Sequence, residues 1–160
     1  ITITDPLMTR FMMTLNDAVE LVLYAFKRGG NGDIFVQKSP AATIEVLTSA
    51  LLEVLGKSSY PVEIIGSRHG EKLYEVLAGR EELAHAEDLG DYFRLPPDVR
   101  DLNYAKYFER GSERLTEALH GDDYNSSNTH LLNSVSMAEL LKKTGFIRNI
   151  LNGERISHED

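Results

Sequence analysis

The chain has 160 residues, of which 42% are hydrophobic and 26% are charged, a composition typical of one globular domain with an extension. The formal net charge of -8 argues against a nucleic acid or an anionic membrane as partner, because both require a basic surface. The chain has no cysteine, which excludes disulfides and thiolate chemistry and agrees with a cytoplasmic location.

Apolar spacing predicts strands that alternate with helices. In chain order, the segments are a strand at 1–4, a helix at 15–26, a strand at 33–37, a helix at 44–54, a strand at 62–66, a short helix at 80–87, a strand at 91–95, a helix from 136 to 143 and a further turn at 146–151. We expect Asn16 or Asp17 to cap the first long helix and Thr43 the second. A capping box beginning at Ser136 is expected to open the last one.

This order of elements predicts an α/β or α+β fold, of which we take α/β as the fold class. Pro96 and Pro97 mark the end of the compact part, so we divide the chain into a compact domain at 1–100 and a C-terminal extension at 101–160. The chain opens without a methionine in the middle of a strand pattern, and we therefore expect it to be a piece of a longer protein. No apolar run approaches membrane-spanning length, so a membrane partner is not expected.

Two short runs carry the most specific chemistry, MTRF at 8–11 and RHGEK at 68–72. Arg10 and Arg68 each offer a planar guanidinium fork that suits phosphate oxygens, and Glu71 can accept hydrogen bonds from a ribose diol. Gly70 within the second run would allow the backbone to approach a ligand closely. The alternative is that these are ordinary surface charges, with Arg68 and Glu71 paired in a solvated turn.

Other candidates are weaker. Met8, together with Met12 and Met13, could line a pocket for a base, although methionines near a helix start are more often core residues. The histidines have no ligand-like spacing, so no metal site is expected. The chain has neither a G-x-G-x-x-G fingerprint nor a tyrosine or methionine followed four residues later by lysine. We therefore assign it binding groups and no catalytic residue.

The chain closely resembles the C-terminal half of bacterial polysaccharide-biosynthesis enzymes of the extended short-chain dehydrogenase/reductase superfamily, which are Rossmann-type proteins. The resemblance rests on four runs in the same order, ITDPLMTRF at 3–11, GDIFVQK at 32–38, RHGEK at 68–72 and RDLNY at 100–104. The tail from YNSSNT at 124–129 to about residue 151 resembles the separate C-terminal module of that family.

The resemblance implies a UDP-N-acetylglucosamine 4,6-dehydratase of the 5-inverting type, or alternatively a UDP-glucose or UDP-N-acetylglucosamine 4-epimerase. In such enzymes Arg10 and Arg68 would contact the diphosphate, Glu71 the uridine ribose, and the segment around Ile3 and Thr4 the uracil. Met8 is retained with them as a substrate-binding candidate. From another class, a non-catalytic nucleotide-sugar-binding or oligomerisation module remains open.

The same resemblance implies an N-terminal Rossmann half that holds NAD or NADP together with the acid/base residues. The cofactor would oxidise the sugar at C4 and later return the hydride, either after loss of water across C5 and C6 or to the opposite face of the ketone. We therefore expect this chain alone to be inactive. The whole enzyme is expected to be a cytoplasmic homo-oligomer that acts in capsule or lipopolysaccharide synthesis.

Overall fold

The computed structural model describes residues 1–97 and 121–153. The described residues form two compact units, each assembled from separate stretches of the chain. Unit 1 contains residues 1–12, residues 40–75 and the described residues from 130 onward. Unit 2 contains residues 13–39 together with the described residues between 76 and 129. These units differ from the division at about residue 100 that sequence order suggests, because the chain after 130 packs in unit 1.

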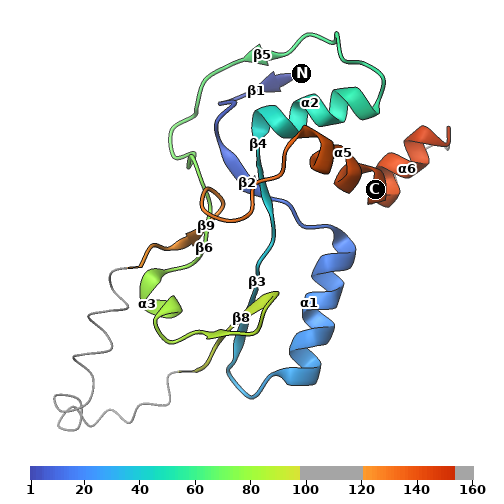
Figure 1. The fold of residues 1–160 in the computed structure, drawn as a ribbon. Helices are drawn as coiled ribbons and strands as arrows, with labels where there is room; N and C mark the ends of the chain where they lie inside the picture. Colours follow the sequence, from blue (N-terminus) through green and yellow to red (C-terminus); the bar gives the residue numbers. More distant parts are fainter. Residues whose placement is uncertain (98–120, 154–160) are drawn as a thin grey trace, which may run out of the picture. The chain divides into compact units, whose positions relative to one another are not determined.

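Unit 1 contains two small sheets and three helices among its described residues (Figure 1). Its elements are β1 (Thr2–Ile3), β2 (Thr9–Phe11), β4 (Ala41–Thr43), α2 (Ile44–Val54), β5 (Glu63–Ile64), α5 (Ser134–Lys143) and α6 (Gly145–Leu151). Strands β1 and β5 are parallel, whereas β2 and β4 are antiparallel, with Arg10 opposite Ala42. The sheets therefore pair segments that are far apart in sequence.

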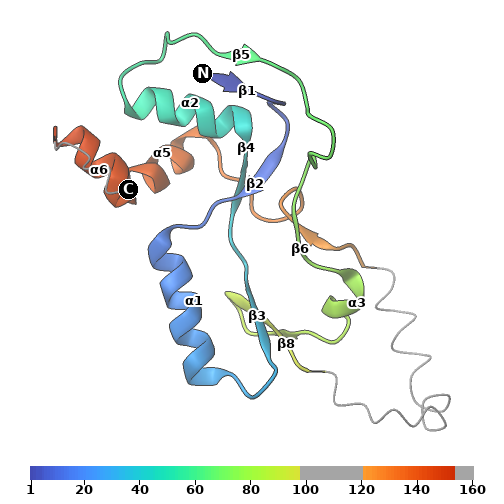
Figure 2. The ribbon, with the colours of Figure 1, turned by 180° about the vertical axis from the view of Figure 1, so that it is seen from behind.

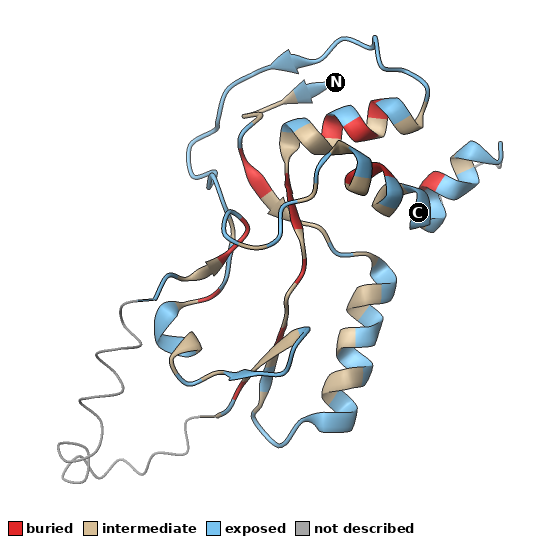
Figure 3. Cartoon of the chain, viewed as in Figure 1, coloured by how far each residue is buried: buried red, intermediate tan, exposed pale blue. Residues whose placement is uncertain are grey.

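The core of unit 1 lies where α2 packs against α5. Its buried members are Ala42, Ala50, Met137 and Ala138, and Figure 3 shows the buried positions along β4, α2 and α5. Ala50 on α2 and Ala138 on α5 are small, which allows the two helices to approach closely, and Ala42 lies on β4. Met137 is 2% exposed and is the largest of the four buried side chains.

Unit 2 is built around an antiparallel three-stranded sheet of order β3-β8-β7, beside which α1 lies (Figure 2). Its elements are α1 (Leu15–Arg28), β3 (Ile34–Gln37), β6 (Val76–Ala78), α3 (Arg80–Leu83), β7 (Glu87–Asp88), β8 (Tyr92–Leu95) and β9 (Tyr124–Asn125). The ring of Tyr24 on α1 stacks on that of Tyr92 at 4.3 Å and meets Phe35 edge-on at 5.7 Å. Aromatic contacts thus fasten the helix to the sheet.

Local capping decides where the helices begin. Thr14 caps α1, and Asp17 completes a capping box by accepting the backbone N–H of Thr14 at 2.8 Å, so Asp17 does serve as a first-turn capping group. Thr43 caps α2, as its position predicts. The expected box at Ser136 is wrong. Asn133 is the N-cap of α5, and Ser136 is the third helical residue, which donates its hydroxyl back to the Asn133 carbonyl.

Several elements differ in extent from their predictions. The predicted strand at 62–66 is only β5, with both residues exposed, and the predicted helix at 80–87 is the single turn α3. In β3 only Val36 is buried, although the pattern predicted a buried strand. The RDLNY run at 100–104 lies outside the described residues. Among the helices that the structure describes, none is long and apolar enough to span a membrane.

Candidate functional site

The RHGEK run forms a tight turn in unit 1. The backbone N–H of Glu71 donates to the carbonyl of Arg68 at 3.1 Å, and the Glu71 carboxylate accepts the backbone N–H of Arg68 at 3.0 Å. Gly70 adopts a φ of +88°, which L side chains rarely adopt. A Cβ on Gly70 would meet no atom within 4 Å, so within the chain the glycine serves the conformation of the turn. The expected close approach of the backbone to a ligand stays a prediction.

Arg10 lies in the middle of β2, and its guanidinium contacts the end of the same run. Nη2 donates to the carbonyl of Lys72 at 2.9 Å, and Nη1 donates to the carbonyl of Thr9 at 2.7 Å. Nε is 3.7 Å from a carboxylate oxygen of Glu75, and the Arg10 side chain is 29% exposed. The backbone adds a further link, because the N–H of Thr9 donates to the carbonyl of Leu73 at 2.9 Å.

The two arginine-bearing runs are therefore adjacent in space. Arg10 is tied to Lys72, and Arg68 lies four residues earlier on that same segment, with its side chain exposed. Two of the five guanidinium N–H groups of Arg10 serve backbone carbonyls, which leaves it fewer donors for a ligand than a free fork offers. Sequence reasoning missed this engagement, because no pattern in either run identifies a backbone carbonyl as the partner of an arginine.

The remaining candidates differ in their access to solvent. Ile3 pairs with Ile64 across the parallel strands β1 and β5 and is partly buried. Thr4 donates its hydroxyl to the sulfur of Met8 at 3.5 Å. Met8 is 2% exposed, and its sulfur lies 3.6 Å from Nη2 of Arg10. Its burial favours a packing role behind Arg10, the alternative that its sequence position left open.

Unit 1 also has an open cleft of about 560 Å³ between α2 and the strands β1 and β5. Ile3, Leu52 and Ile64 line it, and so do the carboxylates Glu45 and Glu53. None of the described lining residues is a lysine, an arginine or a histidine. A diphosphate would meet negative charge here, so this cleft is a poorer anion site than the surface near Arg10 and Arg68.

Unit 2 contains a charged network that joins its strands. Arg94 on β8 donates to Asp33 at 2.9 Å and to Glu87 on β7 at 3.0 Å. Its guanidinium, with the backbone N–H of Gly30, holds the pKa of the Asp33 carboxyl below its ordinary value. Lys38 Nζ lies 2.6 Å from Oδ1 of Asp88 and lowers the pKa of that carboxyl in the same way. The contacts of Arg94 join neighbouring strands, and the Lys38–Asp88 pair links the end of β3 to β7 on the other side of β8. Both indicate a structural role.

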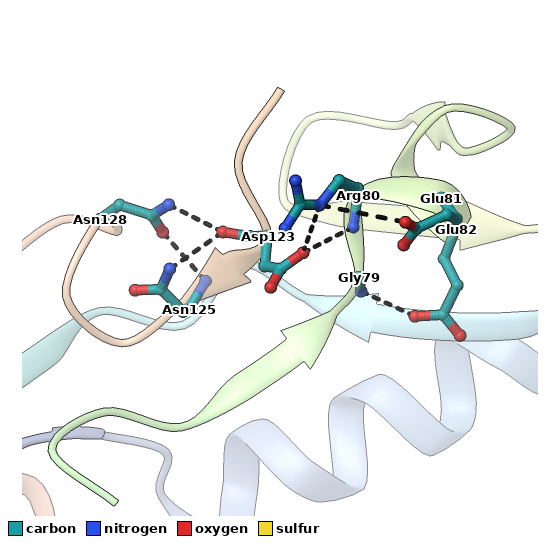
Figure 4. A network of polar contacts seen from close by, with 7 residues as sticks. All are labelled: Gly79, Arg80, Glu81, Glu82, Asp123, Asn125 and Asn128. Carbon is teal, nitrogen blue, oxygen red and sulfur yellow. Dashed lines mark hydrogen bonds and ion pairs between the residues drawn. The ribbon is translucent and has the colours of Figure 1, made fainter. Parts of the chain in front are cut away.

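The YNSSNT run is part of a polar turn that holds α3 (Figure 4). The Asp123 carboxylate accepts a hydrogen bond from the backbone N–H of Arg80 at 2.9 Å. The backbone carbonyl of Asp123 accepts hydrogen bonds from the side-chain amides of Asn125 and Asn128 at 3.0 and 2.8 Å. The Asn125 side chain in turn accepts the backbone N–H of Ser127 at 2.8 Å. The asparagines of this run are therefore explained by turn geometry.

The two longest described helices, α1 and α2, do not begin in a cradle for the pyrophosphate of a dinucleotide. Such a cradle needs glycines where a strand leads into a helix, so that the backbone amides can face the phosphates. The turns that open α1 and α2 carry the caps Thr14 and Thr43 and contain no glycine. No group of three or more possible metal ligands of the His, Cys, Asp or Glu type occurs in the part of the chain that the structure describes.

The mixed α/β architecture confirms the predicted fold class, with small sheets flanked by helices. A family model described as "Polysaccharide biosynthesis protein" matches residues 1–97, and one described as "Polysaccharide biosynthesis protein C-terminal" matches residues 98–148. The chain belongs to this polysaccharide biosynthesis protein family, and the family resemblance seen in the sequence is confirmed.

Individual relatives point in the same direction. The chain is 54% identical over 151 residues to the UDP-glucose 4-epimerases of Rickettsia felis, Rickettsia canadensis and Rickettsia prowazekii, a match covering 94% of this chain. The chain spans 43% of the length of each of these relatives. Among solved structures it resembles Pen from Bacillus thuringiensis, with a TM-score of 0.68 and 30% identity, over 88% of this chain and 39% of that one.

Proposed function

We propose that this chain is the UDP-sugar-binding part of an NAD(P)-dependent enzyme that modifies nucleotide sugars for bacterial surface polysaccharide. The observation that carries the proposal is the hydrogen bond from Arg10 to the Lys72 carbonyl, which brings two cationic runs together in an acidic chain. Local positive charge of this kind is what a diphosphate requires in a protein of net charge -8.

Each residue has a specific role in this proposal. Arg68, which is exposed, contacts the diphosphate with its whole fork, and Arg10 contributes the N–H groups that its backbone contacts leave over. Glu71 keeps the turn closed through one oxygen and accepts ribose hydroxyls with its remaining lone pairs. Ile3 and Thr4 lie along the uracil.

We assign the reaction to a 4-epimerase, because the relatives at 54% identity are named UDP-glucose 4-epimerase. The 4,6-dehydratase, which the sequence motifs placed first, is the second candidate. The nicotinamide supplies the hydride chemistry in the whole enzyme, and this chain holds the UDP group so that the sugar has a defined position. Following the family resemblance, we place cofactor binding mainly in the N-terminal Rossmann half of the whole enzyme.

Product analysis of the natural full-length enzyme separates the candidates. The enzyme is incubated with UDP-glucose or UDP-N-acetylglucosamine, and the product is identified by NMR. An epimerase yields the corresponding UDP-galacto sugar, whereas a dehydratase yields a UDP-4-keto-6-deoxy sugar. The mass of the natural protein tests the third possibility. An intact mass near 17.9 kDa favours a non-catalytic module, and a mass about twice that favours an enzyme.

The binding role is tested by replacing Arg68. Loss of a charge-assisted hydrogen bond to phosphate should weaken UDP binding by about 1.5–3 kcal/mol in the Arg68→Ala variant, measured by calorimetry. Arg148→Ala on α6 is the matched control, because Arg148 is also exposed and contributes to none of the proposed contacts. Equal affinity in the Arg68 variant and the wild type would remove the assignment.

A further inference from the structure

The Arg10 guanidinium faces a carboxylate that the proposed UDP site does not use. Glu75 lies 3.7 Å from Nε of Arg10, on the segment that follows the RHGEK turn. Both side chains are accessible, at 29% for Arg10 and 45% for Glu75. An anion that approaches this guanidinium therefore also approaches the carboxylate.

We propose that Glu75 is an internal competitor for anions at Arg10 and sets how tightly the site holds a diphosphate. This inference rests on the proposed function and adds a residue that limits affinity rather than one that contributes to it. Its chemistry follows from charge alone. A phosphate oxygen gains from the guanidinium, and it is repelled by a carboxylate a few ångströms away.

The local charge balance makes this competition effective. The segment 68–75 and β2 carry three cationic side chains, Arg10, Arg68 and Lys72, against the two carboxylates of Glu71 and Glu75. Glu71 is held within the turn by the backbone N–H of Arg68. Removing the Glu75 charge would double the net positive charge of this cluster from one to two.

The competition also gives the site selectivity. An anion that contacts Arg10 alone has one favourable interaction to offset its repulsion by the Glu75 carboxylate, whereas a diphosphate gains a second favourable interaction with Arg68. The expected consequence is weak binding of inorganic phosphate together with useful binding of UDP. Uridine, which has no charge, should not respond to Glu75 at all.

Glu75→Gln tests the proposal, because it removes the charge and keeps the shape. Exposed ion pairs contribute up to about 1 kcal/mol, so UDP should bind up to about fivefold more tightly, with a steeper loss of affinity as salt rises. Glu139→Gln is the matched control, because Glu139 is an exposed carboxylate on α5 that is not part of the proposed site and does not line the cleft with Ile3.

Calorimetry with UDP, inorganic phosphate and uridine, together with thermal unfolding of each variant, gives clear outcomes. Tighter UDP binding in Glu75→Gln alone, with uridine unchanged, supports the proposal. Unchanged UDP affinity, or weaker binding at an unchanged unfolding temperature, overturns it and leaves the proposed function standing. If neither the wild type nor the variant binds UDP, the proposed function fails and this inference fails with it.

Discussion

Gly70→Ala should weaken UDP binding without disturbing the fold. At a φ of +88°, the glycine occupies a backbone region that costs an L residue about 1–2 kcal/mol. The new methyl group would meet no atom within 4 Å, so the cost is conformational and not steric. The turn can relieve it by opening, and Arg68 and Glu71 then lose the positions from which we expect them to contact the ligand.

UDP binding should become weaker by about that same 1–2 kcal/mol, which calorimetry would detect as a five- to thirtyfold rise in the Kd for UDP. The thermal unfolding midpoint should change little, because the turn is exposed. Gly145→Ala is the control: this helical glycine also has open space around its Cβ but no positive φ. If Gly70→Ala binds UDP as the wild type does, the turn geometry does not position the ligand-binding groups.

Two further predictions concern the stability of the two units, one prediction for each unit. Met137→Ala should lower the free energy of unfolding by about 2–5 kcal/mol in urea titrations, because it leaves a cavity between α2 and α5, whereas Met13→Ala at a 40% exposed position should have little effect. Asp33→Asn should destabilise the chain at neutral pH, since the folded-state pKa of Asp33 is depressed by Arg94. The stability that the Asp33 charge contributes is present above the unfolded pKa near 4 and is lost as pH falls through the folded value. The unfolding free energies of wild type and Asp33→Asn should therefore converge in acid. Asp91→Asn, at an exposed position, is the control and should match the wild type at neutral pH.

The long helices could be predicted because their signals are local. The apolar stripe and Thr43 place α2 at Ile44–Val54, as found, and α1 extends two residues beyond its predicted end at 26. In α5 the local signals were ambiguous. Asn133 and Ser136 are both good capping residues, and the chain uses the earlier one.

The short strands could not be predicted, because their partners lie far away in the sequence. β2, β4, β6 and β9 have two or three residues each, which is too short for alternation to be visible. Ala41–Thr43 is a strand because residues 9–11 lie beside it, and Tyr124–Asn125 is one because Val76–Ala78 does. No window of sequence contains both members of these pairs.

The sequence by itself determined the α/β class, the family and the residue types suited to a diphosphate and a ribose, because these depend on composition, periodicity and short motifs. Tertiary structure alone decided the partners of those residues. It placed the Lys72 carbonyl and the Glu75 carboxylate against Arg10 and enclosed Met8 behind it. The physical reason is that a guanidinium binds whichever acceptor the fold brings within reach, and chain pairing over some sixty residues determines which acceptor that is.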